Sequence, residues 1–277
     1  MKVQFENKVM SSLLLFVDNA ILTKGEAFTN HAGLFYPVEN LYNNYYTYAA
    51  PFKQLVSDDS IAGATVMKTV YIDGAQTSIG NNGMHGINHF QGQVHFTSNK
   101  NSSVISGNYS VKDFNIYLTN DSEQKLLFET RHQLNPKYPQ QLSGLAPDAQ
   151  PFPAIFVKNM GGKNTPFALG GTDDTLTKAR LVVLADSNYK CDAVCSILKD
   201  LHYRRIPIHT DLPFDAMGSY TGQNYNYLNL PQDSELGAPL IQDVRVSKMS
   251  MVGDFNRLNP DVFSAFVDFD ISTIRAH

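Results

Sequence analysis

The strongest constraint on the fold is an alternation of side chains near residue 267, in which every second position is apolar and the positions between are mixed. One set of positions holds Phe263, Ala265, Val267, Phe269 and Ile271, and the intervening set holds Ser264, Phe266, Asp268 and Asp270. Because successive side chains of a strand point to opposite faces, this period of two predicts a long β-strand with one continuous apolar face. A second strand is predicted over 241–251, with a reversal at 253–260, so the two should form a long C-terminal β-hairpin.

A helix is predicted over residues 188–203, before this hairpin. The apolar strand 179–185 leads into Asp186 and Ser187, either of which can cap a helix by accepting a hydrogen bond from a free amide of the first turn. The predicted apolar stripe holds Val194, Ile197, Leu198 and Leu201, and Cys191 and Cys195 lie beside it. Pro207 forbids continuation of the helix. With a further strand at 154–158, residues 154–277 are predicted to form an α+β module with a mixed sheet and one main helix.

Residues 61–135 carry a different signal, namely short strands separated by turns. The strand-like stretches are 66–72, 87–90, 94–97, 105–111 and 114–118. Gln91 and Gly92 join two of them as a hairpin, because a glycine supplies the positive φ that a tight turn needs. This part of the chain is therefore predicted to be a small antiparallel β module, and the fold class to be α+β and β-rich.

The remaining segments predict the rest of the domain organisation. Residues 1–60 are rich in aromatic residues and hold neither a helical nor a strand period for long. They are predicted to be an N-terminal arm that packs either on a neighbouring chain or on its own core. Residues 136–153 contain five prolines and are predicted to connect the modules 61–135 and 154–277.

Composition excludes several classes of protein. Charged residues make up 17% of the chain. The usual content is about 25%, so the composition favours β surface and protein contacts over a solvated helical face. The net charge of −4 provides no basic field for nucleic acid or anionic lipid. No stretch approaches the roughly 20 apolar residues of a membrane span, and no secretory signal is expected. Cys191 and Cys195 are expected to be reduced, as in a protein folded in a cytoplasm.

The histidines are the first place to look for chemistry. His85 and His89 have the H-x-x-x-H spacing of zinc-binding helices, and His95 on the next strand makes a three-histidine cluster geometrically possible. Glycines surround the first two, however, and no glutamate follows His85 as the helical motif requires. We therefore expect no metal and no cofactor.

No other motif supports a reaction class. The Gly162-Lys163 pair lacks the residues of a phosphate-binding loop, since Val157 and Asn164 stand at the required glycine and serine or threonine positions. Asp268 and Asp270 share a strand face, which is more simply explained by contact with solvent or a partner than by acid–base chemistry. We expect no catalytic residues and no enzymatic activity.

Several of these stretches resemble the structural proteins of tailed-bacteriophage virions. Residues 87–96 and 105–117 resemble strands of such proteins, and the order of strand 180–185, helix 188–203 and closing hairpin is similar to neck and tail-terminator subunits. The resemblance covers about two thirds of the chain. It implies a ring at the head-to-tail joint or the tail end, folded in the host cytoplasm, whose partners are its own copies and other virion proteins.

An assembling subunit needs contact residues, and two groups are candidates. Tyr42, Tyr45, Tyr46 and Tyr48 offer large contact area at low entropic cost, and Val262 and Phe266 lie on the face of the last strand opposite its core face. Two other functions stay open. One is a β-rich carbohydrate-binding or adhesion module, which the absence of tryptophan disfavours; the other is a small metal-dependent hydrolase using the histidines.

Overall fold

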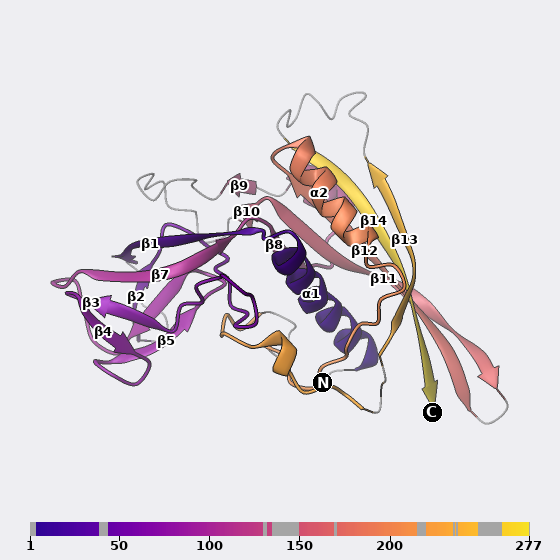
Figure 1. The fold of residues 1–277 in the computed structure, drawn as a ribbon, viewed down its shortest axis with the longest axis horizontal. Coiled ribbons are helices and arrows are strands. Elements are labelled where there is room, and N and C mark those ends of the chain that lie inside the picture. Colours follow the sequence, from indigo (N-terminus) through magenta and orange to yellow (C-terminus); the bar gives the residue numbers. More distant parts are fainter. Residues whose placement is uncertain are drawn as a thin grey trace.

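The computed structural model describes residues 4–38, 44–129, 132–134, 150–168, 171–214, 220–234, 236, 238–248 and 262–276. The chain has an α+β, β-rich fold in which helix α1 lies between two β-sheets (Figure 1). The helices are α1 (Phe5–Lys24) and α2 (Asn188–Lys199), with short helical turns at Lys125–Glu129 and Tyr227–Asn229. The strands are β1 (Phe28–Pro37), β2 (Tyr46–Ala49), β3 (Thr69–Ile72), β4 (Ala75–Ser78), β5 (Met84–Asn88), β6 (Gln93–Phe96), β7 (Ile105–Lys112), β8 (Asn115–Leu118), β9 (His132–Leu134), β10 (Gln150–Phe152), β11 (Ala154–Ala168), β12 (Thr172–Ala185), β13 (Leu240–Lys248) and β14 (Phe263–Ala276).

The first sheet has the order β4-β3-β7-β1-β2-β6-β5, and its strand pairs are antiparallel. It confirms the predicted antiparallel β architecture, but its membership differs. Strands β1 and β2 come from the predicted arm, and β8 belongs to the other sheet. The first sheet has its own apolar core, which includes Phe52, Met67, Phe96 and Tyr109.

The predicted hairpin at Gln91-Gly92 exists with a longer turn. Asn88 of β5 pairs with Gln93 of β6, so residues 89–92 make the connection. Gly92 has a φ of +64°, and a Cβ at this position would lie 2.0 Å from the Phe52 carbonyl oxygen. A side chain at position 92 would therefore force the turn away from the segment that covers it.

The second sheet has the order β13-β14-β12-β11-β8. Its long strands are antiparallel, whereas β8 runs parallel to β11, so the sheet is mixed as predicted. Strand β14 pairs with β12 from Phe263 to Ala276 and with β13 on its other side, which confirms the pairing of the two predicted C-terminal strands. Their predicted reversal at 253–260 lies outside the described residues.

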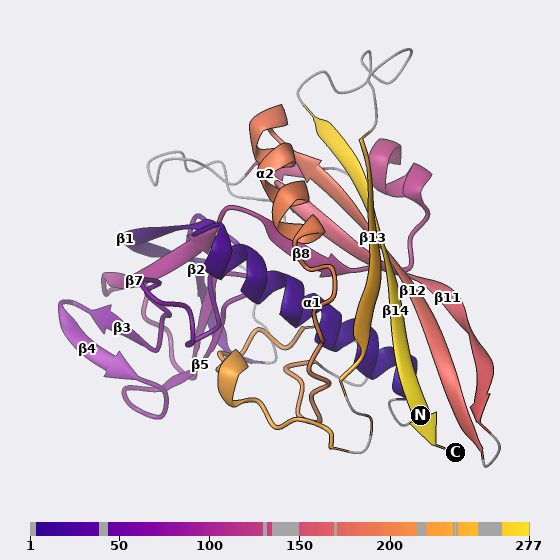
Figure 2. The same ribbon diagram turned by 45° about the vertical axis from the view of Figure 1, so that its right-hand side comes forward.

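Helix α1 corrects the prediction of an irregular N-terminal arm. The helix packs beside α2 on one face of the second sheet, and its other side meets the first sheet and the segment after β2 (Figures 1 and 2). Because it is covered on nearly all sides, its apolar residues do not form a single stripe, and the helical period is weak in the sequence. Its buried apolar residues are Phe5, Val9, Met10, Leu13, Leu14, Leu15, Val17, Ala20, Ile21 and Leu22. No helix among the described residues is long and apolar enough to span a membrane.

Helix α2 confirms the predicted start of the helix. The Ser187 side chain accepts a hydrogen bond from the Lys190 amide and caps the first turn. The helix ends at Lys199, before the predicted end at 203, although Leu201 remains buried beyond it. Its buried face holds Cys191, Val194, Cys195 and Leu198. This face, α1 and the second sheet together form the largest apolar core of the described chain.

Candidate assembly surface

At one end of the second sheet, strands β11, β12 and β14 continue beyond the part paired with β8, and we call this end the blade (Figures 1 and 2). Its β11 strand is exposed, whereas its β12 and β14 strands contact the start of α1, where Thr177 Oγ1 donates to Glu6 Oε1 at 3.0 Å and the Arg275 guanidinium lies 4.0 Å from the centre of the Phe5 ring. The blade consists of residues 160–168 of β11, 172–178 of β12 and 270–276 of β14. Every residue of β11 from 160 to 167 is exposed. A strand that is exposed on both faces adds little to the core of its own chain. Core packing therefore does not account for the length of β11.

The outer edge of β11 is open along the blade. Strand β8 pairs only with residues 154–157 of β11, and no other described strand pairs with this edge beyond Val157. Unpaired main-chain groups on an edge strand can bind another chain. Two register shifts, at 159–162 and 166–168, together with Pro166, interrupt the ladder and limit indiscriminate pairing. The edge is therefore suited to a partner of matching shape.

Apolar side chains are exposed on the blade. Met160, Phe167 and Ile274 are 45%, 64% and 60% exposed. Phe167 and Ile274 line a groove of about 370 Å³ beside the blade, together with Leu236, Ala238 and Leu240. Asp174 and Arg205 supply charges in the same groove. Apolar and polar groups are thus combined here in the way usual for a protein interface.

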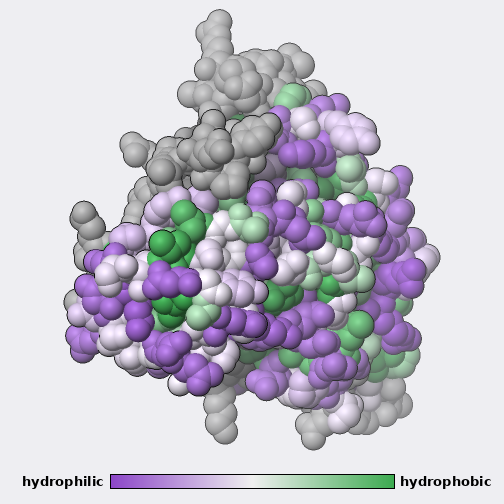
Figure 3. Space-filling model, turned by 60° about the vertical axis from the view of Figure 1, so that its left-hand side comes forward, coloured by the Kyte–Doolittle hydropathy of each residue, from purple (hydrophilic) through white to green (hydrophobic). Residues whose placement is uncertain are grey.

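The outer part of the first sheet does not offer a comparable surface. Its exposed large apolar side chains include Leu34, Ile79 and Val104. On the face of the molecule in Figure 3, apolar residues form separate small groups among hydrophilic ones. Scattered apolar residues of this kind are normal on a soluble surface and do not indicate a binding site.

Phe266 and Val262, predicted to contact a partner, pack on the chain itself. Both are half-buried against an apolar cluster on the second sheet's other face, which includes Tyr117, Phe156 and Leu184. The Arg180 guanidinium lies 5.3 Å from the centre of the Phe266 ring, and its Nε and Nη2 donate to Asp268 at 2.6 and 2.9 Å. Asp268 and a second acid, Glu123, raise the Arg180 pKa.

Changing Phe266 to Asp should therefore lower the free energy of unfolding by about 1–3 kcal/mol, because it removes a half-buried ring from this cluster and places a carboxylate there. Urea unfolding followed by circular dichroism measures the loss. Leu228→Asp is the matched control, because Leu228 is exposed and is not part of the blade. Its change should stay within about 0.5 kcal/mol. Equal losses in both variants would contradict the internal packing of Phe266.

The tyrosines that were predicted to contact a partner also pack, to different extents, on their own chain. Tyr48 is buried in the core of the first sheet, where its hydroxyl accepts from the Lys100 amide at 2.6 Å and donates to Asn101 Oδ1 at 2.9 Å. Tyr45 is half-buried and stacks on His85 with ring centres 3.9 Å apart. Tyr46 packs against the same core, and Tyr42 lies outside the described residues. Of the described rings, that of Tyr48 is fully buried within its own chain.

The three histidines do not form one cluster: His85 and His95 lie near each other on the paired strands β5 and β6, and His89 is bonded elsewhere. His85 is exposed and stacks on Tyr45, whereas His95 Nδ1 lies 3.0 Å from Thr47 Oγ1. His89 is buried, and its two ring nitrogens lie 2.9 Å from the carbonyl oxygens of Met67 and Gly222. Burial lowers the pKa of His89, and those two carbonyls oppose this effect. No group of three or more potential metal ligands converges within the described part of the chain.

The acidic residues, cysteines and glycine considered in the sequence each have a structural role. Asp268 binds Arg180, and Asp270 Oδ2 accepts from Arg245 Nη2 at 2.7 Å, so the two carboxylates form cross-strand ion pairs. Cys191 and Cys195 are free thiols on the buried face of α2. Gly162 lies in β11, where a Cβ would be 2.1 Å from the Leu176 carbonyl oxygen. Close approach of the strands therefore explains a glycine there.

The sequence reasoning missed the blade. Strand β14 continues through Ser272–Ala276, although the regular apolar alternation ends at Ile271. The β-branched residues Thr273 and Ile274 in this stretch were the available sequence signal. No protein-family model matches this chain, and no curated protein shows detectable sequence similarity to it.

Proposed function

We propose that this chain is a non-enzymatic structural subunit that assembles with copies of itself into a ring. The main support is the exposed blade, in which residues 160–167 of β11 present an unpaired strand edge and apolar side chains. The setting we propose is the neck or the tail end of a tailed-bacteriophage virion. That setting rests on the resemblance of residues 87–96 and 105–117 to virion structural proteins of tailed bacteriophages, and of the strand, helix and hairpin of 180–271 to neck and tail-terminator subunits.

The two edges of the second sheet explain how a ring would close. Strand β13 forms the edge opposite to β11, and most of its residues are half-buried or exposed. The segment 203–206 already bonds to the main chain of Pro239 and Ile241, so among the described residues the open part of this edge is 243–248. When the β11 edge of one copy meets the β13 edge of the next, the contact joins two different surfaces. Such head-to-tail contacts produce a closed ring if the rotation between copies closes, and a filament if it does not.

The exposed apolar residues give this contact more than main-chain bonds. Phe167 and Ile274 are exposed on the free chain. Assembly would bury this surface, and each Å² of apolar surface removed from water stabilises the contact by about 25 cal/mol. Because both side chains lie outside the two apolar cores, they can be replaced without disturbing those cores. Phe167 and Ile274 are therefore the residues to change first.

Sedimentation-velocity ultracentrifugation over a hundredfold range of concentration tests the proposal. The unchanged protein should form a defined oligomer, and Phe167→Asp combined with Ile274→Asp should shift it to the monomer with an unchanged circular dichroism spectrum. Leu228→Asp is the matched control, because Leu228 is 73% exposed in the helical turn Tyr227–Asn229 and is not part of the blade. A monomer at every concentration, or an oligomer insensitive to the double change, would refute assembly through the blade.

A carbohydrate-binding module and a hydrolase remain the alternative functions. The described residues favour neither, since His85, His89 and His95 do not form one cluster. The exposed tyrosines Tyr189 and Tyr203 offer aromatic surface, but they lie at α2 and just beyond it and form no described pair of stacked rings with each other.

A further inference from the structure

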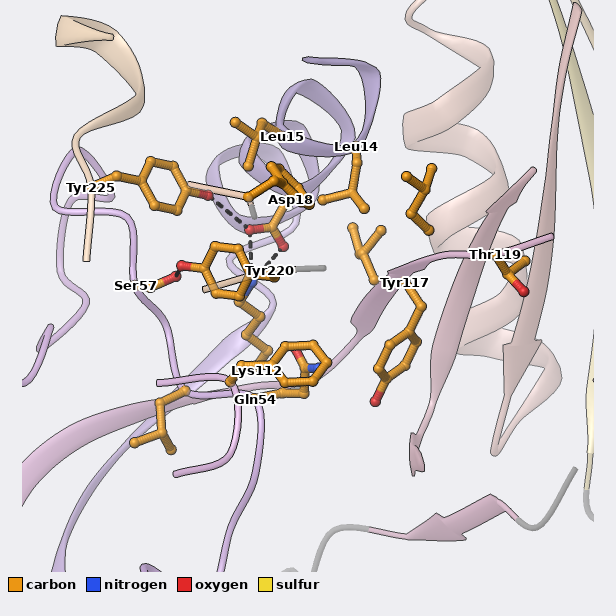
Figure 4. Close-up of a pocket in the computed structure, with 15 residues that line it drawn as sticks. Leu14, Leu15, Asp18, Gln54, Ser57, Lys112, Tyr117, Thr119, Tyr220 and Tyr225 are labelled. Carbon is orange, nitrogen blue, oxygen red and sulfur yellow. Dashed lines mark hydrogen bonds and ion pairs between the residues drawn. The ribbon is translucent and has the colours of Figure 1, made fainter. Parts of the chain in front are cut away.

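A cavity of about 270 Å³ lies where α1 meets the end of β7, strand β8 and the segments around Leu55 and Tyr220 (Figure 4). It is separate from the blade. Its walls combine apolar residues with polar ones. The apolar residues are Leu14, Leu15, Leu55, Phe90, Ile116, Leu118 and Phe214, and the polar residues are Asp18, Gln54, Ser57, Lys112, Tyr117, Thr119, Tyr220 and Tyr225. A dry apolar cavity of about 150 Å³ already accommodates a benzene molecule, so this space is large enough for a small organic molecule.

A neutralised ion pair forms one side of the cavity. Lys112 Nζ donates to Asp18 Oδ1 at 2.8 Å and to Oδ2 at 2.7 Å, and Asp18 is 3% exposed. The Tyr225 hydroxyl lies 3.4 Å from Asp18 Oδ2, and burial raises the pKa of Tyr225 well above its ordinary value. Because the two charges satisfy each other and the tyrosine stays protonated, this wall favours neither an anion nor a cation.

Gln54 is held in an unusual backbone conformation at the cavity. It is 3% exposed and has a φ of +57°, a left-handed conformation that is rare and costly for a residue with a side chain. Its main-chain amide donates to the Phe90 carbonyl oxygen, and its carbonyl oxygen accepts from the Lys112 amide. The backbone at Gln54 is thus fixed from both sides.

The side chain of Gln54 contributes a polar group that the protein leaves unpaired. Its amide nitrogen, Nε2, is buried and has no hydrogen-bond partner among the residues described. Tyr117 lies near this side chain: burial raises the Tyr117 pKa, and Gln54 opposes the rise, but no hydrogen bond of normal length satisfies Nε2. Buried donors of this kind are rare in native structures unless another molecule satisfies them.

We propose that the cavity binds a small, neutral, largely apolar molecule whose carbonyl oxygen accepts a hydrogen bond from Gln54 Nε2. The apolar walls fit the body of such a ligand, and the internally paired Asp18 and Lys112 demand no ligand charge. A preformed apolar pocket with a few fixed polar groups is the usual form of a small-molecule site. The left-handed backbone at Gln54 fits a residue held in place for such a contact.

Two probes of similar shape separate the hydrogen bond from apolar filling. Cyclohexanone carries a carbonyl oxygen, and methylenecyclohexane has a CH₂ group in its place. Titration of the full chain, followed by the methyl NMR signals of Leu14 and Ile116, should give saturable shifts with both probes. Cyclohexanone should bind about 3–10 times more tightly, the range expected for one hydrogen bond.

Two variants test the named groups. Gln54→Met keeps the length of the side chain but removes the donor, and it should weaken cyclohexanone about 3–10-fold while leaving methylenecyclohexane unchanged. Leu118→Phe fills the cavity and should weaken both probes, whereas Leu228→Phe, on the exposed surface, should weaken neither. If Gln54→Met does not fold, the affinity ratio in the unchanged protein and the Leu118→Phe result decide the matter.

Absence of saturable shifts up to the solubility limit of the probes would overturn the proposal. Equal affinity of the unchanged protein for the two probes would overturn it as well, as would unchanged binding in the Leu118→Phe variant. These outcomes are independent of assembly, because neither Gln54 nor Leu118 belongs to the blade.

Discussion

Replacing Lys112 with methionine should lower the free energy of unfolding by about 3–5 kcal/mol, because the change leaves a buried carboxylate without its cation. Asp18 is almost fully buried in α1, and Lys112 of β7 donates to both of its oxygens. Methionine keeps much of the apolar stem, so the loss reports on the charge. Urea unfolding at pH 7 measures it.

A surface pair provides the control for this prediction. Lys125 and Asp121 are also 2.8 Å apart, but their side chains are 53% and 41% exposed. Lys125→Met should therefore cost no more than about 1 kcal/mol. The combined change of Asp18→Asn and Lys112→Met should recover part of the stability, since no unpaired charge remains. A loss below about 1 kcal/mol in Lys112→Met alone would mean that Asp18 is not held as a buried anion.

The second large effect is expected in α1. Leu13 is completely buried among α2 and the second sheet. Leu13→Ala should therefore lower the free energy of unfolding by about 2–5 kcal/mol. Lys24 is exposed at the end of the same helix, and Lys24→Ala should cost no more than about 1 kcal/mol. Thermal and urea unfolding give both values. If the segment were an arm outside the core, the two variants would be equally stable.

An element that is covered on one face alone carries a clear period in its sequence, and an element that is covered on all sides does not. Strand β14 and helix α2 were predictable because each buries one face, which leaves a period of two or of 3.6 in the sequence. Helix α1 is covered on nearly all sides and lacks such a stripe. Strand β8 was assigned to the wrong sheet, because its parallel partner β11 begins only at Ala154, beyond β9 and β10, and nothing local specifies that pairing.

The predicted contact surface changed for a related reason. The pattern of one strand identified Phe266 as an apolar residue opposite the core face, but it could not show that Tyr117, Leu126 and Phe152 cover that second face. In the blade, by contrast, the local sequence does not show that a strand is present. Residues 160–167 contain glycines, Thr165 and Lys163 among few apolar side chains, and only the pairing of β11 with β12 reveals that they form an extended strand.

The position of α1 also determines when the largest core can form during synthesis. This helix ends at Lys24 and packs in one core with β12 and β14, yet β14 begins only at Phe263. At about 5–20 residues per second, a ribosome needs at least roughly ten seconds to make the roughly 240 residues between them. Throughout that interval a helix-forming segment with apolar side chains on nearly every side lacks its final strand partner. This core is thus completed only after Phe263–Ala276 has been made, and until then the nascent chain is a natural substrate for chaperones that bind exposed apolar segments.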